Sequence, residues 1–138
     1  MSQVSATPKL LFVCVENSNR SQMAEAFARI HGSGSVEAFS AGSNPSGKIN
    51  PKAVAAMQEK GYDLSRHEWK SLQDVPQGPY EYVITMGCGD ACPVFPGKRY
   101  LDWELEDPAG KGVESVRPIR DEIGTRIRGL LAELLPAR

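Results

Sequence analysis

The residues with the clearest chemical potential are a cysteine and an arginine near the N-terminus. Cys14 is followed by five residues and then by Arg20 and Ser21. A loop of this length that runs from a strand into a helix can point successive backbone N–H groups at one tetrahedral oxyanion. Arg20 can bind two oxygens of that anion, and the same positive field favours Cys14 as a nucleophilic thiolate. We therefore predict an oxyanion site, with Ser21 able to donate to the thiolate, formed by Val15, Glu16, Asn17, Ser18, Asn19, Arg20 and Ser21.

The alternative for this segment is a buried cysteine at a strand end that precedes an unrelated surface arginine. The spacing from Cys14 to Arg20 occurs often by chance. Its position between a strand pattern and a helix pattern is more specific, because open α/β sheets bind ligands at the carboxyl ends of their strands. This position favours the oxyanion site.

Two further thiols, Cys88 and Cys92, are four residues apart in a segment rich in Gly and Pro. With Cys14 they make three cysteines, so a framework of structural disulfides would leave one over. In a reducing cytoplasm, thiols are more often metal ligands or redox groups than structural pairs. Three interpretations stay open: structural burial, a metal site with Cys14 or His67, and a thiol relay. We favour the relay, because it uses all three thiols and because zinc usually takes closer cysteine spacing and a fourth ligand.

The elements that must position these groups alternate between strand and helix. Asn50 is a helix cap, Gly32 and Gly61 are helix stops, and Pro118 fits only the first turn of a helix or else kinks it. The alternation predicts a small α/β domain with a mainly parallel sheet. Apolar periodicity predicts strands at 10–13, 36–40, 82–86 and 99–103, helices at 21–32, 50–61 and from 115 onward, and a loop at 87–97.

Length and composition exclude several classes of protein. A chain of 138 residues with 41% hydrophobic and 24% charged residues fits one packed domain, which we expect at 9–138 after a flexible tail at 1–8. The net charge of −1 argues against a nucleic acid or a membrane surface as partner. No apolar run approaches the roughly 20 residues of a membrane span. The N-terminus shows no signal peptide pattern, so we expect a cytoplasmic protein.

The segment VCVENSNRSQMAEAF resembles the phosphate-binding loop and first helix of the low-molecular-weight protein tyrosine phosphatases. It is still more similar to the arsenate reductases built on that fold, because Gln22 stands where the phosphatases usually have Pro. The resemblance implies a four-stranded parallel sheet flanked by helices. It covers nearly the whole chain from Leu10 and continues through Phe39-Ser40-Ala41-Gly42, Asn50-Pro51-Lys52-Ala53, Thr85-Met86, Cys92-Pro93 and Asp107-Pro108-Ala109-Gly110-Lys111.

The resemblance also implies a reaction, the reduction of arsenate to arsenite. Cys14 would attack arsenate, with phosphate and sulfate as competing oxyanions, and Asp107 would be the general acid. Thioredoxin-coupled members carry two further cysteines, the second before a Pro, as in Cys92-Pro93. They imply a relay in which Cys88 attacks Cys14, Cys92 then attacks Cys88, and thioredoxin reduces the resulting pair. The relay requires the segment 87–97 to move, and it needs no bound cofactor and no metal.

Some reductases of this family bind potassium beside the loop. The matching positions here are Asn17, Glu25 and Ser40, with Lys70 in place of an acidic residue. We expect the Lys70 ammonium to replace the potassium ion and to pair with Glu25. The alternative is that Lys70 is a solvated surface residue.

Two rival functions remain. One is a low-molecular-weight phosphatase that uses Cys14, Arg20 and Asp107, with water hydrolysing a phospho-Cys14 intermediate. In the phosphatases, aromatic residues commonly follow the Asp-Pro pair to bind phosphotyrosine, whereas Ala109-Gly110-Lys111 suits a small inorganic substrate better. The other rival is a non-catalytic protein that binds an oxyanion or zinc.

Overall fold

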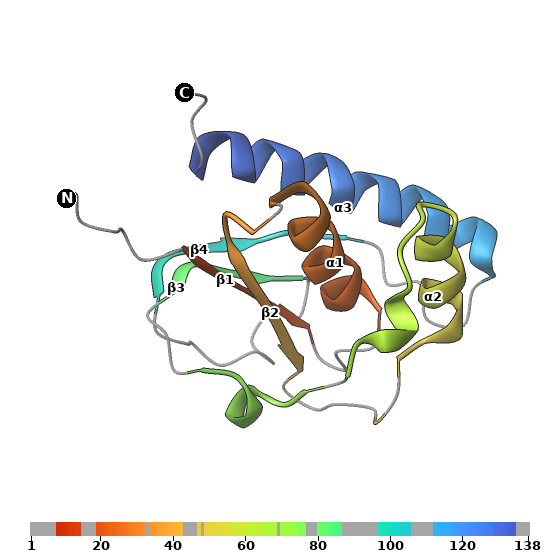
Figure 1. The fold of residues 1–138 in the computed structure, drawn as a ribbon, viewed down its shortest axis with the longest axis horizontal. Coiled ribbons are helices and arrows are strands. Elements are labelled where there is room, and N and C mark those ends of the chain that lie inside the picture. The colour runs from red at the N-terminus through yellow and green to blue at the C-terminus, as the bar shows by residue number, and fades with distance from the viewer. Residues whose placement is uncertain are drawn as a thin grey trace.

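The computed structural model describes residues 8–14, 19–32, 34–42, 47, 49–68, 70–76, 80–86, 97–105 and 112–134. Figure 1 shows the fold. In chain order its strands, α-helices and short 3₁₀ helices (η) are β1 (Lys9–Cys14), α1 (Arg20–Gly32), β2 (Glu37–Gly42), α2 (Pro51–Gln58), η1 (Leu64–Arg66), η2 (Leu72–Asp74), β3 (Tyr80–Thr85), β4 (Gly97–Asp102) and α3 (Val113–Leu134).

The described strands form one parallel sheet of four strands in the order β2-β1-β3-β4. This confirms the predicted four-stranded parallel sheet. Cys14 on β1 lies opposite Gly42 on β2, and Val13 lies opposite Thr85 on β3. Thr85 in turn lies opposite Asp102 on β4. The carboxyl ends of the strands therefore meet at one edge of the sheet, and Cys14 is on its central part.

The two faces of β1 are buried against different parts of the chain. Because side chains alternate along a strand, Leu10, Phe12 and Cys14 join the core made with α1, α2 and α3. Leu11 and Val13 belong to a second, smaller core on the opposite face, which includes Val75, Tyr80 and Val83. Figure 1 shows the three α-helices on one side of the sheet and η2 on the other. Burial on both faces explains the continuous apolar run of β1.

Two contacts hold α3 against the other helices. Gly124 has no side chain where the Phe27 ring of α1 approaches, and a Cβ there would come within 3.3 Å of that ring. The guanidinium of buried Arg120 donates to the carbonyl of Ala56 at 3.0 Å and to Glu59 at 2.7 Å. Hydrogen bonds from Arg117 and Arg120 lower the pKa of Glu59 to about 2, so this carboxylate stays charged over the physiological range.

Several element boundaries differ from the sequence expectation. The helix that starts at Pro51 ends at Gln58, and Gly61 lies in the following turn with φ +79°. Gly97, expected in a loop, is the first residue of β4. The last helix begins at Val113, so Pro118 lies inside it beyond the first turn, which excludes the first of the two predicted positions for this proline. Asn50 does cap α2, since its Oδ1 accepts from the Lys52 N–H at 2.8 Å.

No helix in the described ranges is long and apolar enough to cross a membrane. Residues 1–7 of the expected tail lie outside the described residues, as do 87–96 of the expected loop.

Candidate active site

Cys14 lies at the carboxyl end of β1 and is buried, with 4% of its surface exposed. Its Sγ is 2.9 Å from the Oγ of Ser21, which is on the first turn of α1 and fully buried. The last residue of β1, Cys14, and the second residue of α1, Ser21, are therefore in side-chain contact. If Cys14 is a thiolate, the Ser21 hydroxyl is the donor in this contact, because a thiolate can only accept.

Arg20 is the first residue of α1 and is hydrogen-bonded to two other strand ends. Its Nη1 donates to the carbonyl of Met86, directly after β3, at 2.9 Å. It also donates to the carbonyl of Leu105, shortly after β4, at 3.1 Å. These bonds fix the guanidinium at the same sheet edge as Cys14, and the sequence did not reveal them.

The remaining predicted catalytic residues lie outside the described residues: Cys88, Cys92, Asp107 and the loop residues Val15, Glu16, Asn17 and Ser18. In the sequence, Cys88 follows Met86 by two residues and Asp107 follows Leu105 by two. Met86 and Leu105, whose carbonyls bind Arg20, are therefore the last described residues before Cys88 and Asp107.

A buried carboxylate lies about one turn farther along α1 than Ser21. Glu25 is 3% exposed and accepts from Ser40 Oγ at 2.5 Å and from two nitrogens of Arg29 at 2.9 and 2.7 Å. Lys70 Nζ is 3.6 Å from Glu25 Oε1 and donates to the carbonyl of Glu68 at 2.8 Å. The structure thus brings three predicted residues together, Glu25, Ser40 and Lys70. Arg29 was not predicted, although its spacing of four residues from Glu25 on one helix was a usable signal.

His67, considered in the sequence only as a candidate metal ligand, connects this region to the first turn of α1. Its Nδ1 is 3.0 Å from Gln22 Oε1, and its Nε2 is 2.6 Å from the Tyr62 hydroxyl. Gln22 Nε2 donates to the carbonyl of Glu68 at 3.1 Å, which fixes Gln22 Oε1 as an acceptor. Neutral His67 therefore carries its proton on Nδ1, and Tyr62 donates to Nε2. Through Gln22, this network holds the turn that bears Arg20 and Ser21.

The charge state of His67 makes a testable prediction about stability. Burial lowers the pKa of His67 below its ordinary value of 6.5; nearby Glu25 opposes this shift, and Arg29 and Lys70 add to it. Below pH 6.5 the unfolded chain therefore binds more protons than the folded one. The free energy of unfolding should fall as pH is lowered from about 7 to about 5.

Urea unfolding of the wild type and of His67→Gln at both pH values measures this effect. Glutamine can donate to Gln22 and accept from Tyr62 but does not titrate, so the decline should be smaller in this variant. His31→Gln is the comparison variant: the pKa of His31 is also lowered, but His31 is exposed while the His67 side chain is only 8% exposed, so this variant should reduce the decline less than His67→Gln does. A decline that His67→Gln leaves unchanged would contradict the assignment.

The described residues contain no cluster of three or more His, Cys, Asp or Glu side chains that could hold a metal ion. The described part of the site instead carries a thiol, a guanidinium and a hydroxyl at the carboxyl edge of a parallel sheet. This arrangement is compatible with the predicted site for a tetrahedral oxyanion in an α/β protein.

Comparison with known proteins identifies the family. The model of the low molecular weight phosphotyrosine protein phosphatase family matches residues 9–137. The chain belongs to this family, and its phosphatase-like fold is the one that the sequence predicted.

The similar proteins of this family include arsenate reductases. The chain is 36% identical to the glutaredoxin arsenate reductase of Synechocystis, over 91% of this chain and 98% of that protein. A solved structure described as an arsenate reductase in the phosphate binding state has a TM-score of 0.82 at 36% identity, covering 91% of this chain and 98% of the other. A thioredoxin-dependent arsenate reductase of Corynebacterium glutamicum has a TM-score of 0.75 at 40% identity, covering 95% of this chain and 63% of the other.

Proposed function

We propose that this protein is an enzyme that reduces arsenate to arsenite. The observation that carries the proposal is the contact of Cys14 Sγ with Ser21 Oγ at 2.9 Å beside Arg20, in a chain similar to arsenate reductases over nine-tenths of its length. The same site chemistry would bind phosphate and sulfate as competing oxyanions. We further propose one catalytic domain over residues 9–138 that works in the cytoplasm, where its thiols stay reduced.

The first step forms a bond between sulfur and arsenic. Arsenate is held by the backbone N–H groups of residues 15–21 and by Arg20, whose Nη1 is already fixed by Met86 and Leu105. The Cys14 thiolate attacks arsenic, and a hydroxyl leaves as water after taking a proton from Asp107. Ser21 stabilises the thiolate before attack by donating a hydrogen bond. Arsenic is still in its pentavalent state in this adduct.

The second step transfers the electrons. Cys88 attacks the Cys14 sulfur, the bonding pair stays on arsenic, and trivalent arsenite leaves as a Cys14–Cys88 disulfide forms. Cys92 then attacks Cys88, which forms a Cys88–Cys92 disulfide and returns Cys14 as a thiolate. A dithiol partner reduces this last disulfide, so each arsenate consumes two electrons. No bound cofactor takes part in these steps.

We propose thioredoxin as the dithiol partner. Two thiols besides the nucleophile are what an internal relay needs, and one similar structure is described as thioredoxin-dependent. A similar curated protein is described as a glutaredoxin arsenate reductase, so the test must include both donors.

The coupled assay follows arsenate-dependent oxidation of NADPH by the full chain. We expect oxidation with thioredoxin and thioredoxin reductase, and much slower oxidation with glutaredoxin, glutathione and glutathione reductase. If NADPH is oxidised only with the glutaredoxin system, thioredoxin is the wrong donor, but the proposed reduction of arsenate still holds. No arsenate-dependent oxidation with either system would contradict the reductase function and favour the phosphatase, which uses the same Cys14, Arg20 and Asp107.

Lys70 is proposed to substitute for a potassium ion. Its ammonium lies 3.6 Å from Glu25 and donates to the Glu68 carbonyl, so it supplies a positive charge beside this carboxylate. We therefore expect equal turnover and equal melting temperatures in KCl and NaCl of the same ionic strength. A rise in either quantity that is specific to potassium would contradict the substitution.

A further inference from the structure

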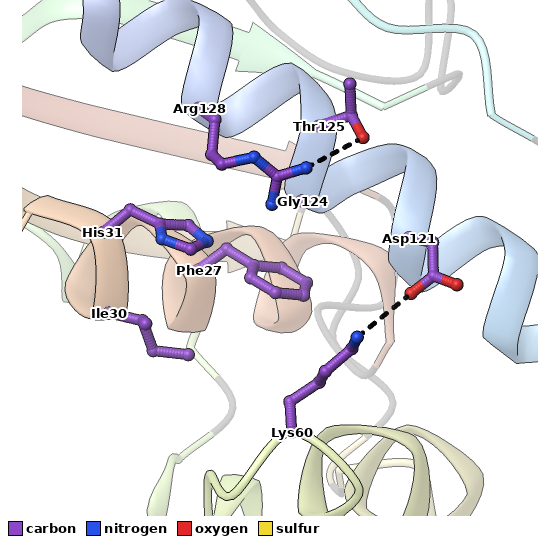
Figure 2. Close-up of a pocket in the computed structure, with 8 residues that line it drawn as sticks. All are labelled: Phe27, Ile30, His31, Lys60, Asp121, Gly124, Thr125 and Arg128. Atoms are coloured by element: carbon purple, nitrogen blue, oxygen red, sulfur yellow. Dashed lines mark hydrogen bonds and ion pairs between the residues drawn. The ribbon is translucent and has the colours of Figure 1, made fainter.

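A second concave site lies away from the sheet edge, between α1, the end of α2 and α3. This α1–α3 pocket has a volume of about 310 Å³, and the residues that matter for its chemistry are Phe27, His31, Lys60, Asp121, Gly124 and Arg128. Figure 2 shows these side chains around the pocket. The pocket residues are distinct from those that surround Cys14, so the proposed function does not use them.

The inner wall of the α1–α3 pocket contains two aromatic rings. The rings of Phe27 and His31, one turn apart on α1, are stacked with an interplanar angle of 4° and centroids 5.7 Å apart. Phe27 is buried with Gly124 of α3 packed against its ring, whereas His31 is exposed. A wall of this kind favours a planar apolar group, because ring faces gain dispersion and burial from stacking.

The rim of the α1–α3 pocket carries a positive excess. Figure 2 shows Arg128 extending toward the two rings from α3, while Lys60 extends from the opposite side. Lys60 Nζ is 3.9 Å from Asp121, and Arg128 donates to Thr125 Oγ1 at 3.3 Å, so Asp121 offsets one of the two cations. The whole chain has a net charge of −1, which makes this local excess distinctive. Such a rim attracts an anion.

We propose that the α1–α3 pocket binds a small planar organic anion, with its ring against Phe27 and His31 and its anionic group directed to Lys60 and Arg128. The pocket volume lies at the lower end of the range for ligand sites, which suits a molecule of one or two rings. A carboxylate or sulfonate can pair with both cations at the rim. The site is separate from the oxyanion loop.

His31 reports on occupancy of the pocket. Burial and the nearby Arg128 guanidinium lower the pKa of His31, and an anion bound beside the ring would favour the charged imidazolium and raise that pKa. The chain contains only two histidines, so the buried His67 serves as an internal reference.

The experiment titrates the full chain with 2-naphthoate, in the presence of excess phosphate that saturates the oxyanion loop, and follows the histidine signals by NMR. We expect saturable shifts of His31, a raised His31 pKa and unchanged His67 signals. The double variant Lys60→Gln with Arg128→Gln should weaken binding about tenfold. The matched double variant Lys52→Gln with Arg126→Gln also removes one lysine at α2 and one arginine of α3. It should bind 2-naphthoate as the wild type does.

Two further ligands test the separate roles of the cations and the rings. The neutral analogue 2-naphthylmethanol should bind much more weakly than 2-naphthoate. Sulfate should not displace bound 2-naphthoate. Equal binding of the neutral analogue would contradict the role of the cations, and displacement by sulfate would contradict the role of the rings. Absence of a saturable His31 shift, or equal weakening in the two double variants, would overturn the site itself.

Discussion

Replacing Cys14 with Ser should abolish arsenate turnover, with a loss of roughly 10⁴-fold or more. A serine hydroxyl is far less ionised than a thiol near neutral pH, and it forms neither the sulfur–arsenic adduct nor a disulfide with Cys88. Both steps of the proposed reaction therefore fail at once. The measurement is the coupled assay with thioredoxin, in which Cys14→Ser should give only the background rate of NADPH oxidation.

Binding of the oxyanion separates lost chemistry from a damaged site. Cys14 is 4% exposed, and serine at this position keeps a group that can hydrogen-bond to Ser21. Phosphate should therefore raise the melting temperature of both Cys14→Ser and the wild type, because Arg20 and the loop N–H groups remain in the variant. Arsenate turnover that persists in a variant shown to bind phosphate would exclude Cys14 as the nucleophile.

The position of Cys14 could be predicted because local patterns determine it. A short apolar run followed by a helical periodicity places the cysteine at a strand end, and the structure has β1 ending there and α1 beginning at Arg20. The cap at Asn50 is local in the same way, since one side chain bonds the backbone two residues later. Such features involve only neighbouring residues, so the sequence displays them directly.

The surroundings of Arg20 depend on contacts between distant parts of the chain. Met86 and Leu105, whose carbonyls it binds, are 66 and 85 residues away, and their pairing follows from the strand order. Hydrophobic periodicity predicts that strands exist but carries no information about which strands are neighbours. His67 shows the same limit, because only the fold brings it to Gln22, 45 residues earlier.

Pro118 shows a different limit. Interior proline costs helix stability, so the sequence allowed either a first-turn position or a kink. The helix extends past this residue on both sides, and Val116, Ile119, Ile123 and Ile127 bury one face of it against the core. Burial of that face outweighs the local cost of one proline, so packing overrides propensity here.

Replacing Cys92 with Ser should collapse thioredoxin-coupled turnover to background while hydrolysis of an aryl phosphate survives. Without Cys92 the Cys14–Cys88 disulfide has no internal thiol to resolve it, and Cys14 stays oxidised after one arsenate. The phosphatase reaction needs Cys14, Arg20, Asp107 and water but neither of the other thiols, so it is the internal control for folding. Unchanged arsenate turnover in Cys92→Ser would exclude the relay and leave phosphatase with incidental cysteines as the better account.

The matched variant Cys88→Ser determines the order of transfer. One equivalent of arsenate should oxidise Cys92→Ser, so that the protein loses the mass of two hydrogen atoms. Peptide mapping should locate the resulting disulfide between Cys14 and Cys88. Cys88→Ser should form no disulfide under the same conditions, because Cys92 is the second acceptor and does not attack Cys14. A Cys14–Cys92 disulfide in Cys88→Ser, at the rate of the wild type, would reverse the order of the two thiols. The two single variants therefore test the existence of the relay and its direction separately, since turnover reports the first and the trapped disulfide reports the second.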